Sequence, residues 1–195
     1  GWFPMHTQWP VHMSTQQHYE RYPWPKKTPA TIETQPLWKD GEAAESRNTW
    51  YSALAEAAFM TGLERNADVV QMASYAPLLA HVEAWQWRPD LIWFDNLNVI
   101  GTPNYDVQKM FSTHRGTNVI SVTSAGKALA GQDSLYASGT IDRQAGKAYI
   151  KLINASASGK SVVLSLDVAP ANKDAVRESL MAENLTDFNS ISNPA

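Results

Sequence analysis

The chain has 195 residues, of which 44% are hydrophobic and 18% charged, so it can form a packed core and is not disordered over its length. Its net charge of −3 and the lack of a basic stripe argue against nucleic acid as the main partner, and no apolar run approaches the ~20 residues of a membrane span. Cysteine is absent, which excludes disulfides, thiolate catalysis and cysteine-ligated zinc.

The first residues differ in composition from the rest. They contain neither an initiator Met nor the basic-then-apolar pattern of a signal peptide, so we expect a processed product or a fragment. All eight Trp residues stand at or before Trp93, and six of the eleven Pro residues stand at or before Pro36. These differences predict two regions that meet between residues 95 and 115. Over residues 1–40 the prolines forbid long helices and predict loops with short strands or turns.

The clearest predicted helix covers residues 48–64, with Asn48 or Ser46 as its N-cap. Its alanines favour a helix, and apolar side chains at helical spacing form one face: Tyr51, Leu54, Ala55, Ala58, Phe59 and Leu63. We expect this face to pack on a buried strand at residues 68–73. Residues 77–85 are predicted as a loop with a helical turn, and residues 90–96 as a second short buried strand.

From residue 118 onward the apolar residues alternate with polar ones, as in a half-buried strand. The alternation is clearest at Val162, Leu164, Leu166 and Val168, so residues 147–168 are predicted as one hairpin. Turn signals containing glycine recur at positions 126, 131, 139, 146 and 159. Short strands with turns every ~8–12 residues are typical of an antiparallel sandwich. We expect this half to carry no catalytic group.

A long part of the sequence carries a family likeness. The stretch NTWYSALAEAAFMTGLERNADVVQMASYAPLLAHVEAWQWRPDLIWFDN is followed by GTPNYDVQKMFSTHRGT, GKALAGQDSLYAS and AENLTDFNSISNP. Together they resemble the α-L-arabinofuranosidases of glycoside hydrolase family 51, collinearly over roughly residues 41–195. The resemblance implies an α/β plus all-β chain, in which the last segments of a (β/α)8 barrel precede an antiparallel jelly-roll-like β-sandwich. The domains would be residues 1–105 (the C-terminal part of the barrel, poorly matched over 1–40) and residues 106–195 (the sandwich).

The same resemblance implies a hydrolase that releases terminal α-L-arabinofuranosyl groups from arabinose-containing polysaccharides, with retention of configuration. Retention needs two carboxylates ~5–5.5 Å apart, one a nucleophile and one an acid/base. Glu42, in the segment Gly41-Glu42-Ala43-Ala44, matches the family's nucleophile, and the Gly before it lets the backbone turn tightly. The alternative is that Glu42 is a solvated first-turn acid favoured by the helix dipole. No cofactor and no metal are expected.

The acid/base of the family lies in an Asn-Glu pair, and this sequence contains none. We therefore expect hydrolysis to need an upstream catalytic segment or a partner chain, and the isolated chain to be inactive. A second hypothesis is a non-catalytic carbohydrate-binding or structural β-sandwich accessory chain. The expected partner is an arabinose-containing polysaccharide or oligosaccharide. The compartment stays open, and the periplasm or secretion is favoured over the cytoplasm.

Four further residues are candidate sugar contacts. Trp85 and Trp87 offer aromatic planes that stack on sugar rings, and the alternative for both is packing between the two domains. Trp93 lies in an apolar run and is predicted to belong to the core. Asn104 and Tyr105 follow a Gly-Thr-Pro turn that resembles the family's loop after the eighth barrel strand, and they are expected to bind sugar hydroxyls. Their alternative is a turn-former beside an aromatic residue at the rim.

Overall fold

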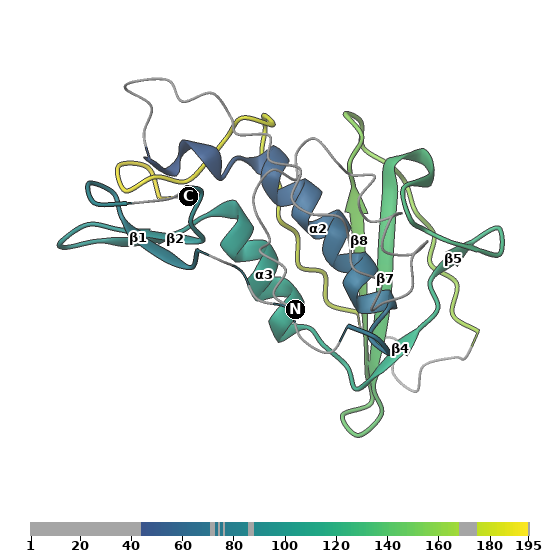
Figure 1. The fold of residues 1–195 in the computed structure, drawn as a ribbon. Coiled ribbons are helices and arrows are strands. Elements are labelled where there is room, and N and C mark those ends of the chain that lie inside the picture. Colours follow the sequence, from purple (N-terminus) through teal and green to yellow (C-terminus); the bar gives the residue numbers. More distant parts are fainter. Residues whose placement is uncertain are drawn as a thin grey trace.

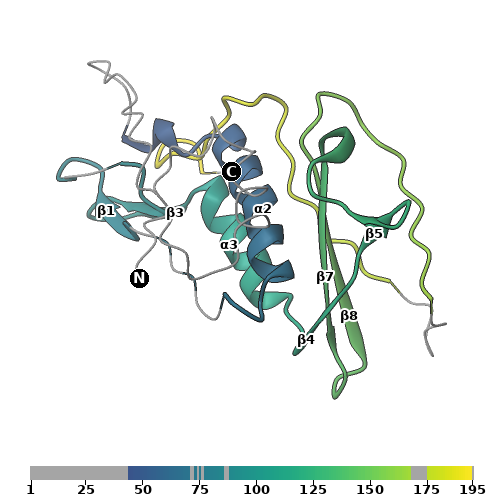
Figure 2. The ribbon, with the colours of Figure 1, turned by 45° about the vertical axis from the view of Figure 1, so that its right-hand side comes forward.

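Two packed helices lie between two small sheets in the computed structural model of the chain (Figures 1 and 2). The structure describes residues 44–70, 73, 75, 77–85, 88–167 and 175–194. In chain order its elements are η2 (Ala44–Arg47), α2 (Trp50–Arg65), β1 (Leu79–His81), β2 (Ile92–Phe94), β3 (Val99–Gly101), α3 (Pro103–Thr113), β4 (Asn118–Ile120), β5 (Thr123–Ser124), β6 (Lys127–Ala128), η3 (Gln132–Ser134), β7 (Leu135–Asp142) and β8 (Lys147–Asn154).

The predicted helix at residues 48–64 is confirmed as α2. Its N-cap is Thr49, whose hydroxyl accepts a hydrogen bond from the Ser52 N–H, and not Asn48 or Ser46. The helix is buried on more than the one predicted side. Ala53, Ala57 and Ala58 form a core cluster with Val107 of α3 and with Tyr136 and Ile153 of the β7–β8 sheet.

The opposite side of α2 carries Phe59, which packs with Tyr75 and Leu91 in a second core cluster. The expected partner strand at residues 68–73 is wrong over its described residues, since residues 66–69 form a turn. The cause is local: the Asn66 carbonyl accepts hydrogen bonds from the N–H groups of Val69 and Val70, at 3.0 and 2.8 Å. A backbone that turns back on itself in this way cannot extend directly into a strand.

The predicted strand at residues 90–96 is confirmed as β2, the middle strand of the sheet β1-β2-β3. The prediction for residues 77–85 is wrong, because β1 forms there and pairs in parallel with β2. β1 is only three residues long and half exposed, so it has no alternating pattern by which to recognise it. β2 and β3 pair antiparallel.

Helix α3 lies within the predicted boundary between residues 95 and 115 and was not expected as a helix. The sequence does carry a start signal: Thr102 is the N-cap, its hydroxyl accepts from the Tyr105 N–H at 3.2 Å, and Pro103 takes the first helical position. The Thr102 hydroxyl also donates to the Leu91 carbonyl, at 2.8 Å. This bond fixes the start of α3 against the residue before β2.

The region after residue 115 is antiparallel β structure, as predicted, with a sheet in the order β4-β7-β8 and a separate hairpin β5-β6. The predicted hairpin at residues 147–168 is wrong, because β8 pairs with β7 over its whole length and residues 161–167 form no strand. The turn between β7 and β8 forms where the Asp142 carboxylate accepts from the N–H groups of Gln144 and Ala145. The turn predicted at Gly139 is wrong, because this residue lies inside β7. A Cβ at this position would come within 2.8 Å of the side chains of Ile120 and Val122.

Candidate functional site

A buried network of polar side chains joins the start of α2 to α3 and β2. Asn48 is fully buried between η2 and α2. Its amide nitrogen donates to the oxygens of Asn104 at 3.2 Å and Tyr75 at 3.4 Å, and its amide oxygen accepts from the indole N–H of Trp93 at 3.3 Å. One asparagine thus holds three parts of the chain together.

The network continues through Asn104, which is 1% exposed. Its amide nitrogen donates to the Ser52 hydroxyl at 3.2 Å and to one carboxylate oxygen of Glu56, and the other oxygen of Glu56 accepts from Gln108. Ser52 and Glu56 are four residues apart and share one side of α2, while Asn104 and Gln108 repeat this spacing on α3. The two polar pairs face each other across the helix contact.

Burial changes the acid–base behaviour of the network. It raises the pKa of Glu56 to about 7, although the hydrogen bonds from Asn104 and Gln108 act in the opposite direction. It also raises the pKa of Tyr75 well above its usual range, with a further contribution from the charge of Glu56. Asp90 lies beside them with its pKa raised by burial to about 6, and its Oδ2 atom has no hydrogen-bond partner among the described residues. Glu56 is only 4% exposed, and both of its hydrogen-bond donors, Asn104 and Gln108, belong to α3, so it contributes to the packing of the two helices.

Asn104 and Tyr105 are neighbours in the first turn of α3 but lie in different surroundings. Asn104 points into the network, where its amide is hydrogen-bonded to the side chains of Asn48, Ser52 and Glu56. Tyr105 packs over Gly101 so closely that a Cβ at that position would lie 2.4 Å from its ring. The tyrosine also lines a groove of about 220 Å³ together with Asp106 and Asn189.

Trp93 and Trp85 both belong to the core cluster beside the β1-β2-β3 sheet. Trp93 is fully buried with Ile100, which confirms its place in the core. Trp85 packs against the same cluster, and the guanidinium carbon of Arg88 lies 4.8 Å from the centre of its ring. Trp87 and Glu42 lie outside the described residues. Their predicted roles stay predictions, as do the sugar contacts of Trp85, Asn104 and Tyr105.

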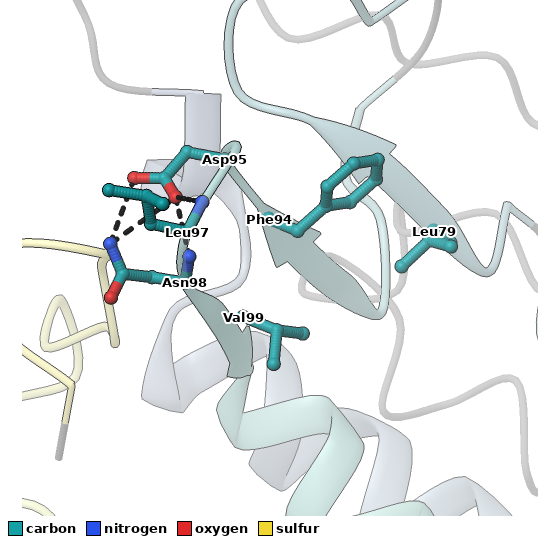
Figure 3. A pocket seen from close by; sticks show the side chains of 6 residues that line it. All are labelled: Leu79, Phe94, Asp95, Leu97, Asn98 and Val99. Carbon is teal, nitrogen blue, oxygen red and sulfur yellow. Dashed lines mark hydrogen bonds between the residues drawn. The ribbon is translucent and has the colours of Figure 1, made fainter.

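A second, open groove of about 380 Å³ lies between β1 and the β2–β3 loop (Figure 3). Its lining is mainly apolar, with Leu79, Phe94, Leu97 and Val99. At one end the Asp95 carboxylate accepts hydrogen bonds from the N–H groups of Leu97 and Asn98 and from the Asn98 side chain, and these bonds lower its pKa. The carboxylate is therefore engaged by its own loop, and a sugar would find few other polar groups in this groove.

Sequence reasoning missed the network itself. The sequence predicts Asn48 only as a helix cap and gives no direct sign of Glu56 among the alanines of α2. The available signal was the pair Ser52 and Glu56, two polar residues at helical spacing on a helix otherwise rich in apolar side chains. Such a pair indicates a buried polar contact once a second helix is known to pack there.

Two further observations concern the described part of the chain. No group of three or more His, Asp or Glu side chains in it is arranged to hold a metal ion. Among the same residues, none of the helices is both long and apolar enough to cross a membrane.

Comparison with known proteins identifies the family. The family described as alpha-L-arabinofuranosidase C-terminal domain matches residues 11–195. The extracellular exo-alpha-L-arabinofuranosidase of Streptomyces chartreusis is 58% identical over 80 residues, which cover 41% of this chain and 10% of that protein. Alpha-L-arabinofuranosidase 1 of Arabidopsis thaliana is 36% identical over 149 residues, covering 73% of this chain and 21% of that protein. The chain thus spans about a fifth or less of the length of these relatives.

A solved structure agrees with the sequence matches. The arabinose-bound α-L-arabinofuranosidase MgGH51 superimposes with a TM-score of 0.62 and 33% identity, over 77% of this chain and 25% of that one. The match therefore extends through most of the described residues. The chain belongs to the α-L-arabinofuranosidases of glycoside hydrolase family 51 and corresponds to their C-terminal region.

Proposed function

We propose that the chain is the C-terminal part of a glycosidase that releases terminal α-L-arabinofuranosyl groups from arabinose-containing polysaccharides with retention of configuration. The observation that carries this proposal is the likeness to MgGH51, which was solved with arabinose bound. In the proposed assignment, residues 1–105 complete a (β/α)8 barrel and residues 106–195 form a jelly-roll-like sandwich. The extracellular relative from Streptomyces supports a secreted protein.

Glu42 is the proposed nucleophile. Its carboxylate attacks the anomeric carbon while an acid/base from the upstream part of the protein protonates the departing oxygen, and water then releases the sugar from the covalent intermediate. Two residues after Glu42 the chain enters η2, and the buried network begins at Asn48. In this proposal the buried network anchors the start of α2, which follows the nucleophile in the chain.

Tyr105 is proposed to contact the substrate. It shares its groove with Asp106 and Asn189, and a ring beside a carboxylate and an amide offers both an apolar surface and groups for hydroxyls. Trp85 and Trp87 are proposed as further stacking surfaces. Asn104, enclosed by the network, is proposed to act through the packing of α3 below Tyr105.

The test measures hydrolysis of 4-nitrophenyl α-L-arabinofuranoside by the natural full-length protein. Glu42→Gln should reduce kcat by at least about 10⁴-fold while sugar binding survives, because an amide keeps the shape but cannot attack. Glu183→Gln, at an exposed carboxylate, is the control. Proton NMR of the first-formed sugar reports whether configuration is retained. An active Glu42→Gln variant, or an inverted product, would contradict the proposed mechanism.

The competing hypothesis, an accessory chain without catalysis, rests on the missing Asn-Glu pair. It predicts that arabinan binds while the full-length protein shows no turnover. The isolated chain separates the two hypotheses less well, because we expect it to be inactive in both.

A further inference from the structure

We propose that the C-terminal return segment, defined as residues 185–193, is a positioning element that holds η2 and the start of α2 in place, directly after Glu42 in the chain. The inference rests on the proposed function for the role of Glu42, and on described contacts for everything else. In Figures 1 and 2 this segment, drawn in yellow, comes back from the β7–β8 side and lies against η2, drawn in purple.

The return segment completes the N-terminus of α2. The first N–H groups of a helix have no partner within the helix and are usually satisfied by side chains or water. Here the Trp50 N–H donates to the Asp187 carbonyl at 2.7 Å, and the Tyr51 N–H donates to the Leu185 carbonyl at 2.9 Å. The next group, on Ser52, donates to the Thr49 hydroxyl, so the return segment takes the two donors that the capping side chain does not reach.

The segment also holds η2 through Glu45. This side chain is 6% exposed, and its Oε1 atom accepts the Ile191 N–H at 3.3 Å. The Ile191 N–H is presented by a tight turn, in which Ser190 and Asn193 exchange backbone hydrogen bonds of 3.1 and 3.0 Å. The Ile191 side chain packs on the cluster of Trp93 and Ile100, so the turn itself is fixed on the sheet.

A third contact ties the segment to the groove of Tyr105. The Asn189 amide donates to the Gly101 carbonyl at 3.0 Å, at the end of β3 and directly below the Tyr105 ring. The same nine residues therefore touch the chain that follows Glu42 and the strand that supports Tyr105. In a retaining site, a nucleophile displaced by ~1 Å loses about 10²-fold in rate. Loosening the segment should therefore lower kcat more than it changes KM.

The experiment compares Glu45→Ala, Glu45→Gln and Glu183→Ala in the natural full-length protein. Hydrogen exchange is followed by mass spectrometry over residues 41–48, and kcat and KM are measured with 4-nitrophenyl α-L-arabinofuranoside at a temperature where circular dichroism shows each variant folded. Glu45→Ala removes the acceptor for Ile191, whereas Glu45→Gln keeps an acceptor oxygen at the same reach. Glu183 lies just before the segment, is exposed and loses the same charge.

The expected result for Glu45→Ala is exchange about tenfold faster over residues 41–48, as one lost hydrogen bond implies. Its kcat should fall about 10- to 100-fold, with KM changing less than about threefold. Glu45→Gln and Glu183→Ala should match the wild type. Unchanged exchange in Glu45→Ala would overturn the proposal, and so would a loss in Glu45→Gln as large as in Glu45→Ala, because the charge and not the hydrogen bond would then matter.

Two provisions keep the test decisive. If Glu45→Ala does not fold, Ile191→Ala replaces it, because this side chain fixes the turn that presents the Ile191 N–H to Glu45. It should raise exchange over residues 41–48 and lower kcat in the same way; no change would overturn the proposal. If the wild type does not hydrolyse arabinofuranosides, the proposed function fails. The exchange measurement still decides whether the return segment holds η2.

Discussion

Replacing Glu56 by Gln should remove a specific pH dependence of stability. The ordinary pKa of this carboxyl group is 4.5, and burial raises it to about 7 in the folded chain. Below pH 4.5 Glu56 is protonated in both the folded and the unfolded chain. Between pH 4.5 and about pH 7 the carboxyl group loses its proton in the unfolded chain and keeps it in the folded chain. The free energy of unfolding therefore falls as the pH rises through this window and levels off above pH 7. The difference between the two pKa values corresponds to about 3 kcal/mol.

The assay is urea denaturation of the wild type and Glu56→Gln at several values between pH 4 and pH 8. The amide cannot titrate, so the stability of the wild type relative to the variant should fall by about 3 kcal/mol across the range. Asp90, whose pKa is also raised, is present in both proteins, so the comparison removes most of its contribution. A difference that stays constant with pH, or that grows in favour of the wild type as the pH rises, would refute the reasoning.

Three other substitutions, with Leu97→Ala as an exposed control, test the packing around α2 and the second sheet by the same denaturation assay. Phe59→Ala should cost about 3–5 kcal/mol, because this side chain is 6% exposed, whereas Leu97→Ala, at a side chain 93% exposed, should cost less than about 0.5 kcal/mol. Glu64→Ala should cost about 1.5–3 kcal/mol, because it leaves Lys151 without the carboxylate that it contacts at 2.5 Å. Gly116→Ala should lower the free energy of unfolding by about 1–3 kcal/mol, because a Cβ would lie 2.4 Å from the backbone of Ile141. An unchanged unfolding midpoint in Phe59→Ala, Glu64→Ala or Gly116→Ala would contradict the contact stated for that residue.

Local sequence patterns predicted the elements that depend on local physics. The helix at residues 48–64 has alanines and apolar spacing, and the strand at residues 90–96 has bulky residues in a short run, so both were recognised. β1 was missed because its pairing with β2 depends on a partner distant in sequence, and its own residues do not alternate. α3 was not predicted although Thr102 and Pro103 are a regular helix start, because the sequence Gly-Thr-Pro is equally typical of a turn in a loop.

The error over residues 147–168 has a different cause. Alternating apolar residues show that a segment can form a strand, but they do not show which neighbour it pairs with. β8 forms its hydrogen bonds with β7, through a tight turn that begins at Asp142 and contains the predicted turn position Gly146. The alternating apolar and polar residues over 162–166 therefore belong to a segment that pairs with no strand, and Val163 within it is 88% exposed.

The candidate site was predictable only where it depends on sequence likeness. The resemblance identified the family, and it gave Glu42 and Tyr105 their expected roles. It gave no sign of Glu56 or Asn48, because a buried polar contact between two helices becomes visible only when both helices are placed. A carboxylate among alanines is indistinguishable in sequence from a solvated side chain.

The contacts at the two ends of α2 join this helix to the second half of the chain. At the N-terminal end, the return segment takes the N–H groups of Trp50 and Tyr51. At the C-terminal end, Glu64 binds Lys151 of β8 and the Ser138 hydroxyl of β7. Both sets of partners come from residues after 115, so the helix that follows Glu42 is fixed at each end by the second half of the chain. Mutations there should therefore reach kcat through α2, without any contact to the sugar.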